Sequence, residues 1–188
     1  MTWLELTNVD LIYRPPRPST LLNSPGRSWD YQVSPELINI LHVEVQKQFD
    51  LYKQGYADKS TIPLYLFLSG AGTGKSRNSS ELWQTTYRCF NGDYFPRMDE
   101  IAHQISNAFV FHISLENGTS MWPSEIDPMV AIGSRMLLQL IQDDNGRASL
   151  KDVHNKFHPT TPLELIEFFL KQDPSRAFFL VVDGLKNI

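Results

Sequence analysis

Residues 63–76 read PLYLFLSGAGTGKS, an apolar run followed at once by a glycine-rich loop. The apolar part, residues 63–68, has the length and composition of a buried β-strand. The loop from Ser69 to Ser76 matches the pattern Gly-x-x-x-x-Gly-Lys-Ser, except that Ser69 stands at the first glycine. We expect a helix from about Lys75 to Phe90. A strand, a glycine loop and a helix in this order predict an anion site, built from backbone N–H groups and the positive end of the helix.

This loop predicts the binding of a nucleoside triphosphate, with ATP and Mg²⁺ as the expected ligands. Lys75 is expected to reach the β- and γ-phosphates, and the hydroxyl of Ser76 to hold Mg²⁺. Serine is compatible with the position of Ser69 if its φ is negative, so the pattern is weakened only slightly. The predicted nucleotide-binding residues are Ser69, Gly70, Ala71, Gly72, Thr73, Gly74, Lys75, Ser76 and Arg77.

A second apolar strand, residues 178–182, ends at Asp183. In a parallel sheet this carboxylate is expected at the same edge as the loop, where it holds Mg²⁺ through water. Apolar strands that end in aspartate are also common at ordinary turns, so the assignment depends on the loop upstream. The predicted metal-binding residues are Ser76 and Asp183.

Hydrolysis also needs a group that orients the attacking water, and usually a cationic group. Gly184 follows Asp183, at the place where many such enzymes carry glutamate. Glu116, after the predicted strand 108–115, is the substitute candidate, although an ordinary turn glutamate explains it equally well. Arg77 and Arg135 are candidates to meet phosphate, or are surface arginines. The catalytic candidates are Lys75, Asp183 and Glu116, and ATPase activity stays an open question at this stage.

Periodicity and capping signals predict the other elements. Ser34, Pro35 and Glu36 predict a helix start, and Thr161 with Glu164 predicts a capping box. The expected helices are 35–55, 99–106, one that begins at Pro128, and 162–171, while residues 147–160 receive no assignment. The expected apolar helix positions are Leu37, Ile38, Leu41, Val45, Phe49 and Tyr52 in the first of these, and Met129, Ile132, Met136, Leu137, Leu140 and Ile141 in the third.

Short apolar strands that alternate with helices predict an α/β fold. We expect a three-layer sandwich of the P-loop NTPase type, with a short, mostly parallel sheet that stops after the Asp183 strand. The expected domain covers residues 34–188. Residues 1–33 are expected to be an irregular extension anchored by Trp3 and Trp29.

Composition limits the class of protein and the class of partner. The chain has 188 residues and a net charge of −4, so it offers no basic field for nucleic acid. Its single cysteine, Cys89, excludes an internal disulfide and a multi-cysteine zinc site, and is expected to be buried. His112, within a strand, is expected to be a core or surface residue. The longest apolar run is too short to span a membrane and no secretory signal is recognisable, so we expect an intracellular protein, cytoplasmic or nuclear.

Four strings together resemble the P-loop NTPase module of Crinkler-type effectors and the related retrotransposon hot spot proteins. They are SGAGTGKSR (69–77), SLENGT (114–119), IGSRML (132–137) and VVDGL (181–185). The resemblance covers residues 60–188, and the two middle strings carry most of its specificity. It implies a longer relative with trafficking and nuclease-like or kinase-like parts, and an association with host cells and the nucleus. Neither flanking part is recognisable here, so host delivery and nuclease chemistry are not carried over. Either the chain is a fragment or a truncated gene product, which the resemblance favours, or the phosphate-loop strand and the Asp183 strand are direct neighbours in a small sheet, as in kinases and GTPases.

Four functions stay open on the sequence alone. The first is a nucleotide-binding module with weak or context-dependent hydrolysis. The second is a competent ATPase that self-associates to supply an arginine. The third is a small nucleotide kinase, and the fourth is a non-enzymatic interaction protein that keeps a degenerate NTPase fold.

Overall fold

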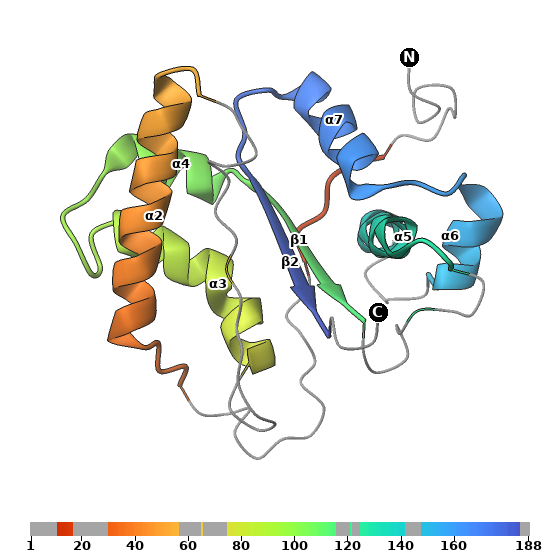
Figure 1. The fold of residues 1–188 in the computed structure, drawn as a ribbon, viewed down its shortest axis with the longest axis horizontal. Coiled ribbons are helices and arrows are strands. Elements are labelled where there is room, and N and C mark those ends of the chain that lie inside the picture. The colour runs from red at the N-terminus through yellow and green to blue at the C-terminus, as the bar shows by residue number, and fades with distance from the viewer. Residues whose placement is uncertain are drawn as a thin grey trace. The chain divides into compact units, whose positions relative to one another are not determined.

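The computed structural model describes residues 11–16, 30–56, 65, 75–115, 121, 125–141 and 148–184. Six helices and a two-stranded parallel sheet lie in these ranges, which confirms an α/β protein (Figure 1). The chain divides into two compact units. We call residues 1–17 with 108–188 the strand unit, and residues 18–107 the helical unit, and we describe each by itself.

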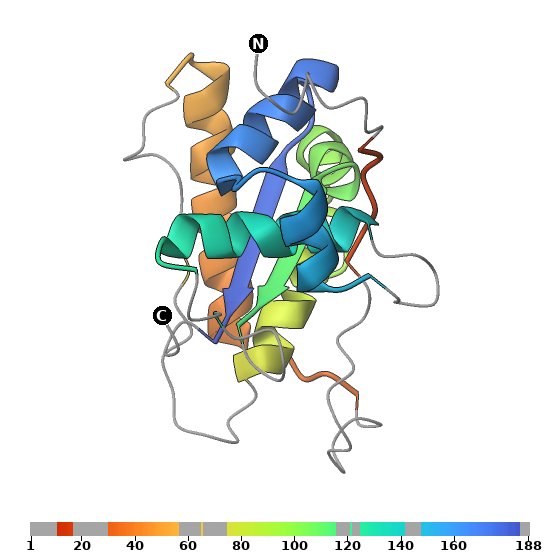
Figure 2. The ribbon, with the colours of Figure 1, turned by 90° about the vertical axis from the view of Figure 1, so that its right-hand side faces the viewer.

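The strand unit contains both strands and three helices. Its elements are β1 (Phe109–Ser114), α5 (Pro128–Ile141), α6 (Leu150–Lys156), α7 (Pro162–Gln172) and β2 (Phe178–Asp183). β1 and β2 pair in parallel, with Phe109 opposite Phe178 and Ser114 opposite Asp183. Helices α5, α6 and α7 lie on the same face of this pair, as the two views agree (Figures 1 and 2).

An apolar cluster joins that face of the sheet to the helices. Alternate residues of β1 belong to it, which fits the period of two in a strand. The buried members are Leu11, Phe109, Phe111, Ile113, Ile132, Met136, Leu137, Leu138, Leu140, Leu150, Val153, Phe157, Leu165 and Phe169. Aromatic rings contribute directed contacts as well as area, for example between Phe111 and Phe178, which stack at 5.3 Å.

Side chains close the edge of β1 that does not pair with β2. The hydroxyl of Tyr13 accepts from the N–H of Val110 at 2.9 Å and donates to its carbonyl at 3.3 Å. Gln139 donates to the same carbonyl at 2.9 Å and accepts from the N–H of His112 at 3.2 Å. These contacts occupy the backbone groups that another strand would need. β1 therefore ends the sheet on this side at these positions.

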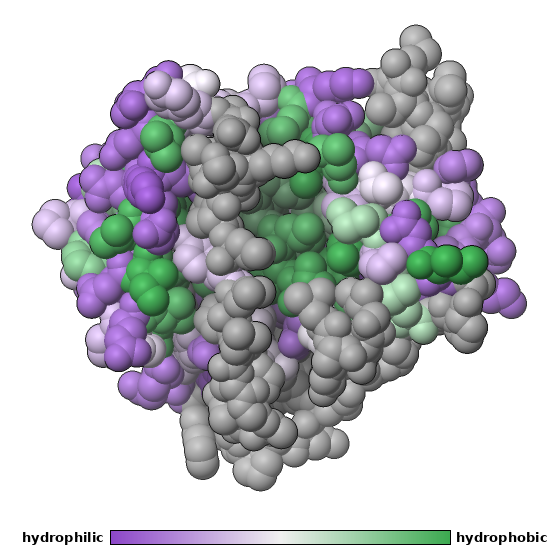
Figure 3. All heavy atoms as spheres, viewed as in Figure 1, coloured by the Kyte–Doolittle hydropathy of each residue, from purple (hydrophilic) through white to green (hydrophobic). Residues whose placement is uncertain are grey.

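The other strand presents apolar side chains on its surface. Leu180 is 39% exposed, and Phe178 and Val182 are only partly buried. Figure 3 shows apolar side chains gathered over β2. In the part of the chain that the structure describes, β1 is the strand that pairs with β2.

Helices α5 and α7 are held together at one close approach. A Cβ added at Gly133 of α5 would lie 1.8 Å from the carbonyl oxygen of Thr160. Thr161 next to it caps α7, where it forms the predicted capping box with Glu164. The string IGSRML thus contains a glycine that packing requires.

Among its described residues, the helical unit contains α2 (Pro35–Lys53), α3 (Lys75–Phe90) and α4 (Asp99–Ser106). Ser34 caps α2 as predicted, and its hydroxyl accepts from the N–H of Glu36 at 3.2 Å. The indole N–H of Trp83 on α3 donates to the carbonyl of Ile105 on α4 at 2.8 Å. Polar contacts of this kind accompany the apolar packing of this unit.

The predicted helices are confirmed close to their predicted bounds. Two residues predicted to be on buried faces are exposed, and one helix was not predicted. Tyr52 and Met129, predicted on apolar faces, are 57% and 49% exposed. Helix α6 lies inside residues 147–160, where no element was assigned, and begins with a capping box between Ser149 and Asp152. The predicted strand 63–68 lies outside the described residues except for Tyr65, as do Trp3 and Trp29. The described helices include none with the length and apolar composition needed to cross a membrane.

Candidate nucleotide site

The predicted phosphate loop leads into α3, which begins at Lys75. Residues 69–74 lie outside the described residues, and the description of Lys75 is limited to its place as the first residue of the helix. Ser76 and Arg77 follow in the first turn, and both are partly buried. The helix start therefore coincides with the lysine of the motif, at the position where the motif requires it.

Tyr31 contacts the first turn of α3. Its hydroxyl donates to the side-chain oxygen of Asn78 at 2.8 Å. The guanidinium of Arg77 lies over its ring, 5.7 Å from the centroid. Burial raises the pKa of the Tyr31 hydroxyl, and a hydrogen bond with Thr85 opposes this shift. Tyr31 carries no local signal in the sequence, because the contact joins residues far apart in the chain.

The C-terminal end of α3 is buried, and its thiol and hydroxyl groups are hydrogen-bonded. Cys89 is fully buried, as predicted, and its thiol donates to the carbonyl of Ile38 at 3.7 Å. Burial raises the pKa of this thiol to about 11, so the reactive thiolate is scarce at neutral pH. Thr86, also fully buried, donates to the carbonyl of Leu82. This end of α3 anchors the helix.

Asp183 ends β2, as predicted, and faces the opposite side of the sheet from the apolar cluster. Its backbone oxygen accepts from the N–H of Leu115 at 2.9 Å, so both strands end at the same edge. In the parallel register, Asp183 lies opposite Ser114, and Val181 lies opposite His112. Side chains two residues apart share a face, and this places His112 on the face of Asp183.

His112 is the polar side chain on this face whose bonding is incomplete. Its Nε2 atom is buried and has no hydrogen-bond partner among the described residues. Burial lowers the pKa of the imidazole, and the negative charge of Asp183 acts in the opposite direction. His112, expected in the core or on the surface, is partly buried and lies on the same face as Asp183, a candidate metal ligand.

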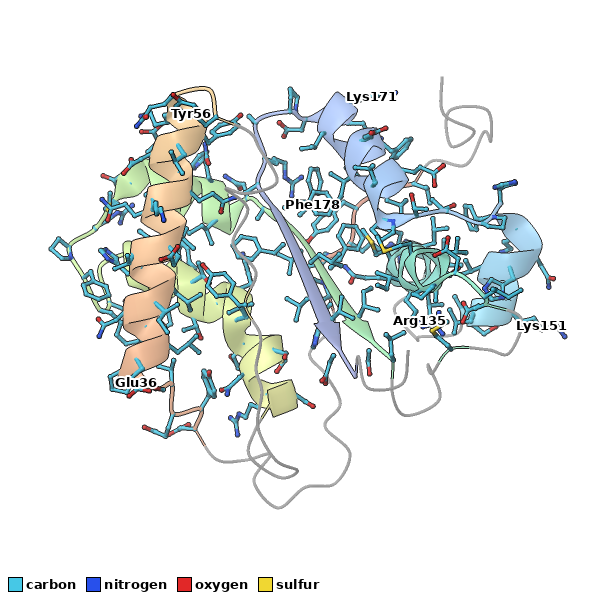
Figure 4. The ribbon with its side chains drawn as sticks, in the orientation of Figure 1. Glu36, Tyr56, Arg135, Lys151, Lys171 and Phe178 are labelled. Carbon is cyan, nitrogen blue, oxygen red and sulfur yellow. The ribbon has the colours of Figure 1, made fainter. Side chains whose placement is uncertain are left out.

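Arg135 is neither a surface arginine nor open to a phosphate. It lies on α5 (Figure 4), and its guanidinium donates to both carboxylate oxygens of Glu125, at 2.8 and 3.0 Å. Both side chains are only 3% exposed. His154 approaches the same carboxylate at 3.3 Å. Arg135 could bind a phosphate only by leaving Glu125 buried without its main partner, which is costly.

The remaining candidates stay predictions. Glu116 and the loop residues 69–74 lie outside the described residues. The loop belongs to the helical unit and Asp183 to the strand unit, so their predicted proximity is untested. Within the described ranges, His, Cys, Asp and Glu side chains form no group of three that could hold a metal ion.

Comparison with known proteins shows a similarity to an effector protein. The chain resembles Crinkler effector protein 108 of Phytophthora sojae, with 35% identity over 133 residues. This similarity covers 67% of the chain and 15% of the relative, so the chain spans a small part of the relative's length. No family model matches the chain, and no solved structure matches it. The similarity supports a Crinkler-type relationship.

Proposed function

We propose that this chain is the nucleotide-binding module of a Crinkler-type effector, and that it binds ATP with Mg²⁺ on the loop Ser69–Ser76. Lys75 contacts the β- and γ-phosphates, and Ser76 holds Mg²⁺. Asp183 holds the same ion through water. The observation that carries the proposal is the pattern Gly-x-x-x-x-Gly-Lys-Ser, with Ser69 at its first position, which leads into α3 at Lys75.

The connections after α3 also support this proposal. The chain continues through α4 into β1, and β1 pairs in parallel with the strand that ends at Asp183. In parallel α/β sheets, ligands bind beyond the carboxyl ends of the strands. The name of the similar Phytophthora protein supplies the effector part of the proposal.

Hydrolysis by the isolated chain is proposed to be weak. Arg135 is engaged by Glu125, so it does not serve as the cationic group that stabilises the transition state. Glu116 is the proposed water-orienting residue, because Gly184 follows Asp183. A second molecule that supplies an arginine would then raise turnover, as such groups do in trans.

Thermal unfolding with and without Mg-ATP tests nucleotide binding. A ligand that binds only the folded state stabilises it by about 2.7 kcal/mol at a hundredfold excess over Kd. We expect Mg-ATP to raise the unfolding midpoint of wild type and to leave that of Lys75→Ala unchanged. Lys47→Ala, at an exposed position on α2, is the matched control and keeps the rise. A folded wild type without any rise would reject nucleotide binding and favour an interaction protein.

A turnover assay over a range of protein concentrations tests the enzymatic part separately. We expect phosphate release per molecule to stay near the level of Lys75→Ala in dilute samples and to increase with concentration. Asp183→Asn should bind ATP with a weaker dependence on Mg²⁺. Release no greater than that of Lys75→Ala at every concentration would leave a binding module without hydrolysis.

A further inference from the structure

The segment before α2 is attached to the first turn of α3 by one side chain. Tyr31 donates its hydroxyl to Asn78 at 2.8 Å, and Arg77 lies over its ring. Thr85, which also hydrogen-bonds Tyr31, lies two turns after Asn78 on the same side of the helix. The ring is therefore held in place at its hydroxyl end along one face of α3.

A fixed ring restricts the guanidinium that lies over it. Arginine loses several freely rotating bonds when it binds an anion, and a contact that orders it beforehand reduces this loss. The face of a tyrosine ring attracts a guanidinium within about 6 Å, which fits the 5.7 Å between Arg77 and Tyr31. Arg77 belongs to the turn that begins at Lys75, where the positive end of α3 already favours anions.

From these contacts we infer that Tyr31 is a positioning residue of the nucleotide site, which acts through Arg77 on the bound triphosphate. The inference rests on the proposed function. It assigns a role to a residue 38 positions before the loop begins at Ser69. Tyr31 itself needs no contact with the ligand: the hydroxyl positions the ring, the ring orients Arg77, and Arg77 provides the charge.

Four variants of the full chain separate these steps. Tyr31→Leu removes the ring and the hydroxyl, and Tyr31→Phe removes only the hydroxyl. Arg77→Gln removes the charge, and the fourth variant combines Arg77→Gln with Tyr31→Leu. Mg-ATP affinity is measured by titration calorimetry, and the unfolding midpoint without ligand is recorded for each variant.

We expect Tyr31→Leu to weaken Mg-ATP binding about fivefold, which is the effect of losing one cation–π contact. Tyr31→Phe should weaken binding less than Tyr31→Leu does, because the ring remains but loses the hydrogen bond to Asn78 that holds it in place. In the Arg77→Gln background, Tyr31→Leu should have no further effect on affinity, although it still lowers the unfolding midpoint. A purely structural Tyr31 would weaken binding equally in both backgrounds.

The results distinguish failure of this inference from failure of the proposed function. If wild type binds Mg-ATP and Tyr31→Leu binds it equally well, the role of Tyr31 is rejected while nucleotide binding stands. If the effects of Tyr31→Leu and Arg77→Gln add, Tyr31 does not act through Arg77. If folded wild type binds no triphosphate, both the proposed function and this role are rejected.

Discussion

The strand unit and the helical unit bury long helices to different degrees. In the strand unit, one face of β1 and β2 and three helices share an aromatic and aliphatic cluster, and α5 is buried along most of its length. In the helical unit, α2 is nineteen residues long, and Leu41 is its one buried residue. Contacts that join a polar group to an aromatic ring or a backbone carbonyl occur in both units, as at Tyr31 and Trp83 in the helical unit and at Tyr13 in the strand unit.

This difference separates two of the strings that resemble the Crinkler family. On α5, Gly133 is required by the backbone of Thr160, and Arg135 is paired with Glu125. On α3, Ser76 and Arg77 lie partly exposed in the first turn, and Arg77 lies over the ring of Tyr31. The α5 string is therefore explained by folding, whereas the start of α3 keeps polar side chains where a ligand can reach them. A string that carries family specificity need not carry function.

Replacement of Arg135 should produce the largest loss of stability. Arg135→Met leaves the carboxylate of Glu125 buried without its bidentate partner, and this costs about 3–5 kcal/mol. We expect this loss in the free energy of unfolding measured with urea. The ligand-induced rise with Mg-ATP should persist, because Arg135 is assigned to folding.

A second substitution in the same pair is the control. Arg135→Met combined with Glu125→Leu removes both charges, and an apolar pair of similar volume often recovers the stability of a buried ion pair. We expect the double variant to be more stable than Arg135→Met alone. A different result would contradict this assignment. If Arg135→Met is as stable as wild type and Mg-ATP no longer raises its unfolding midpoint, Arg135 belongs to the ligand site, and the α5 string is not explained by folding alone.

Gly133→Ala tests the same distinction through the sign of its effect. In an unobstructed helix, alanine is favoured over glycine by about 1 kcal/mol. Here the new Cβ would lie 1.8 Å from the oxygen of Thr160, and overpacking of this kind costs about 1–3 kcal/mol. We therefore expect a lower urea midpoint than in wild type. Met129→Ala, at an exposed position of the same helix, is the control and should change stability by no more than about 0.5 kcal/mol. If Gly133→Ala is more stable than wild type, α5 and the start of α7 are not in close contact.

The elements that sequence reasoning predicted depend on local signals. Ser34 and Thr161 begin their helices with side-chain caps, and the string after the glycine loop begins α3 at Lys75. Helix α6 carried a local signal too, since Ser149 and Asp152 have the spacing of a capping box. With only seven residues, this helix has no clear apolar period, and a capping signal alone does not predict a helix.

The features that were missed depend on contacts between distant residues. Tyr13 and Gln139 close the edge of β1 from two other segments, and Tyr31 contacts Asn78 of α3, 47 positions later in the chain. Arg135 had an indirect signal in the sequence. Its helix is apolar on nearly every side, so an arginine within it must be buried and needs a carboxylate. That reasoning does not by itself identify Glu125 as the partner.

The smallest predicted effect compares one histidine from each unit. Burial lowers the pKa of His112 and of His42 below the ordinary 6.5. The unfolded chain then binds protons more readily than the folded chain, so stability rises with pH. The contribution of each histidine is complete above the unfolded pKa and is lost as the pH falls through 6.5 toward the folded pKa. We expect urea midpoints to decrease from pH 8 to pH 5.5.

The two units should differ in how much they contribute to this decrease. His112 has a buried ring nitrogen without a partner among the described residues, whereas His42 stacks on Phe90 and Phe95 and is only partly buried. His112→Gln should therefore flatten the dependence on pH more than His42→Gln does. Asp152, whose pKa is lowered by hydrogen bonds with Ser149, stays ionised throughout this range and adds no slope. If both variants flatten the pH dependence of the urea midpoint equally, the two units exclude water from these imidazoles to the same degree. If His112→Gln leaves that dependence unchanged, the ring of His112 is in contact with water.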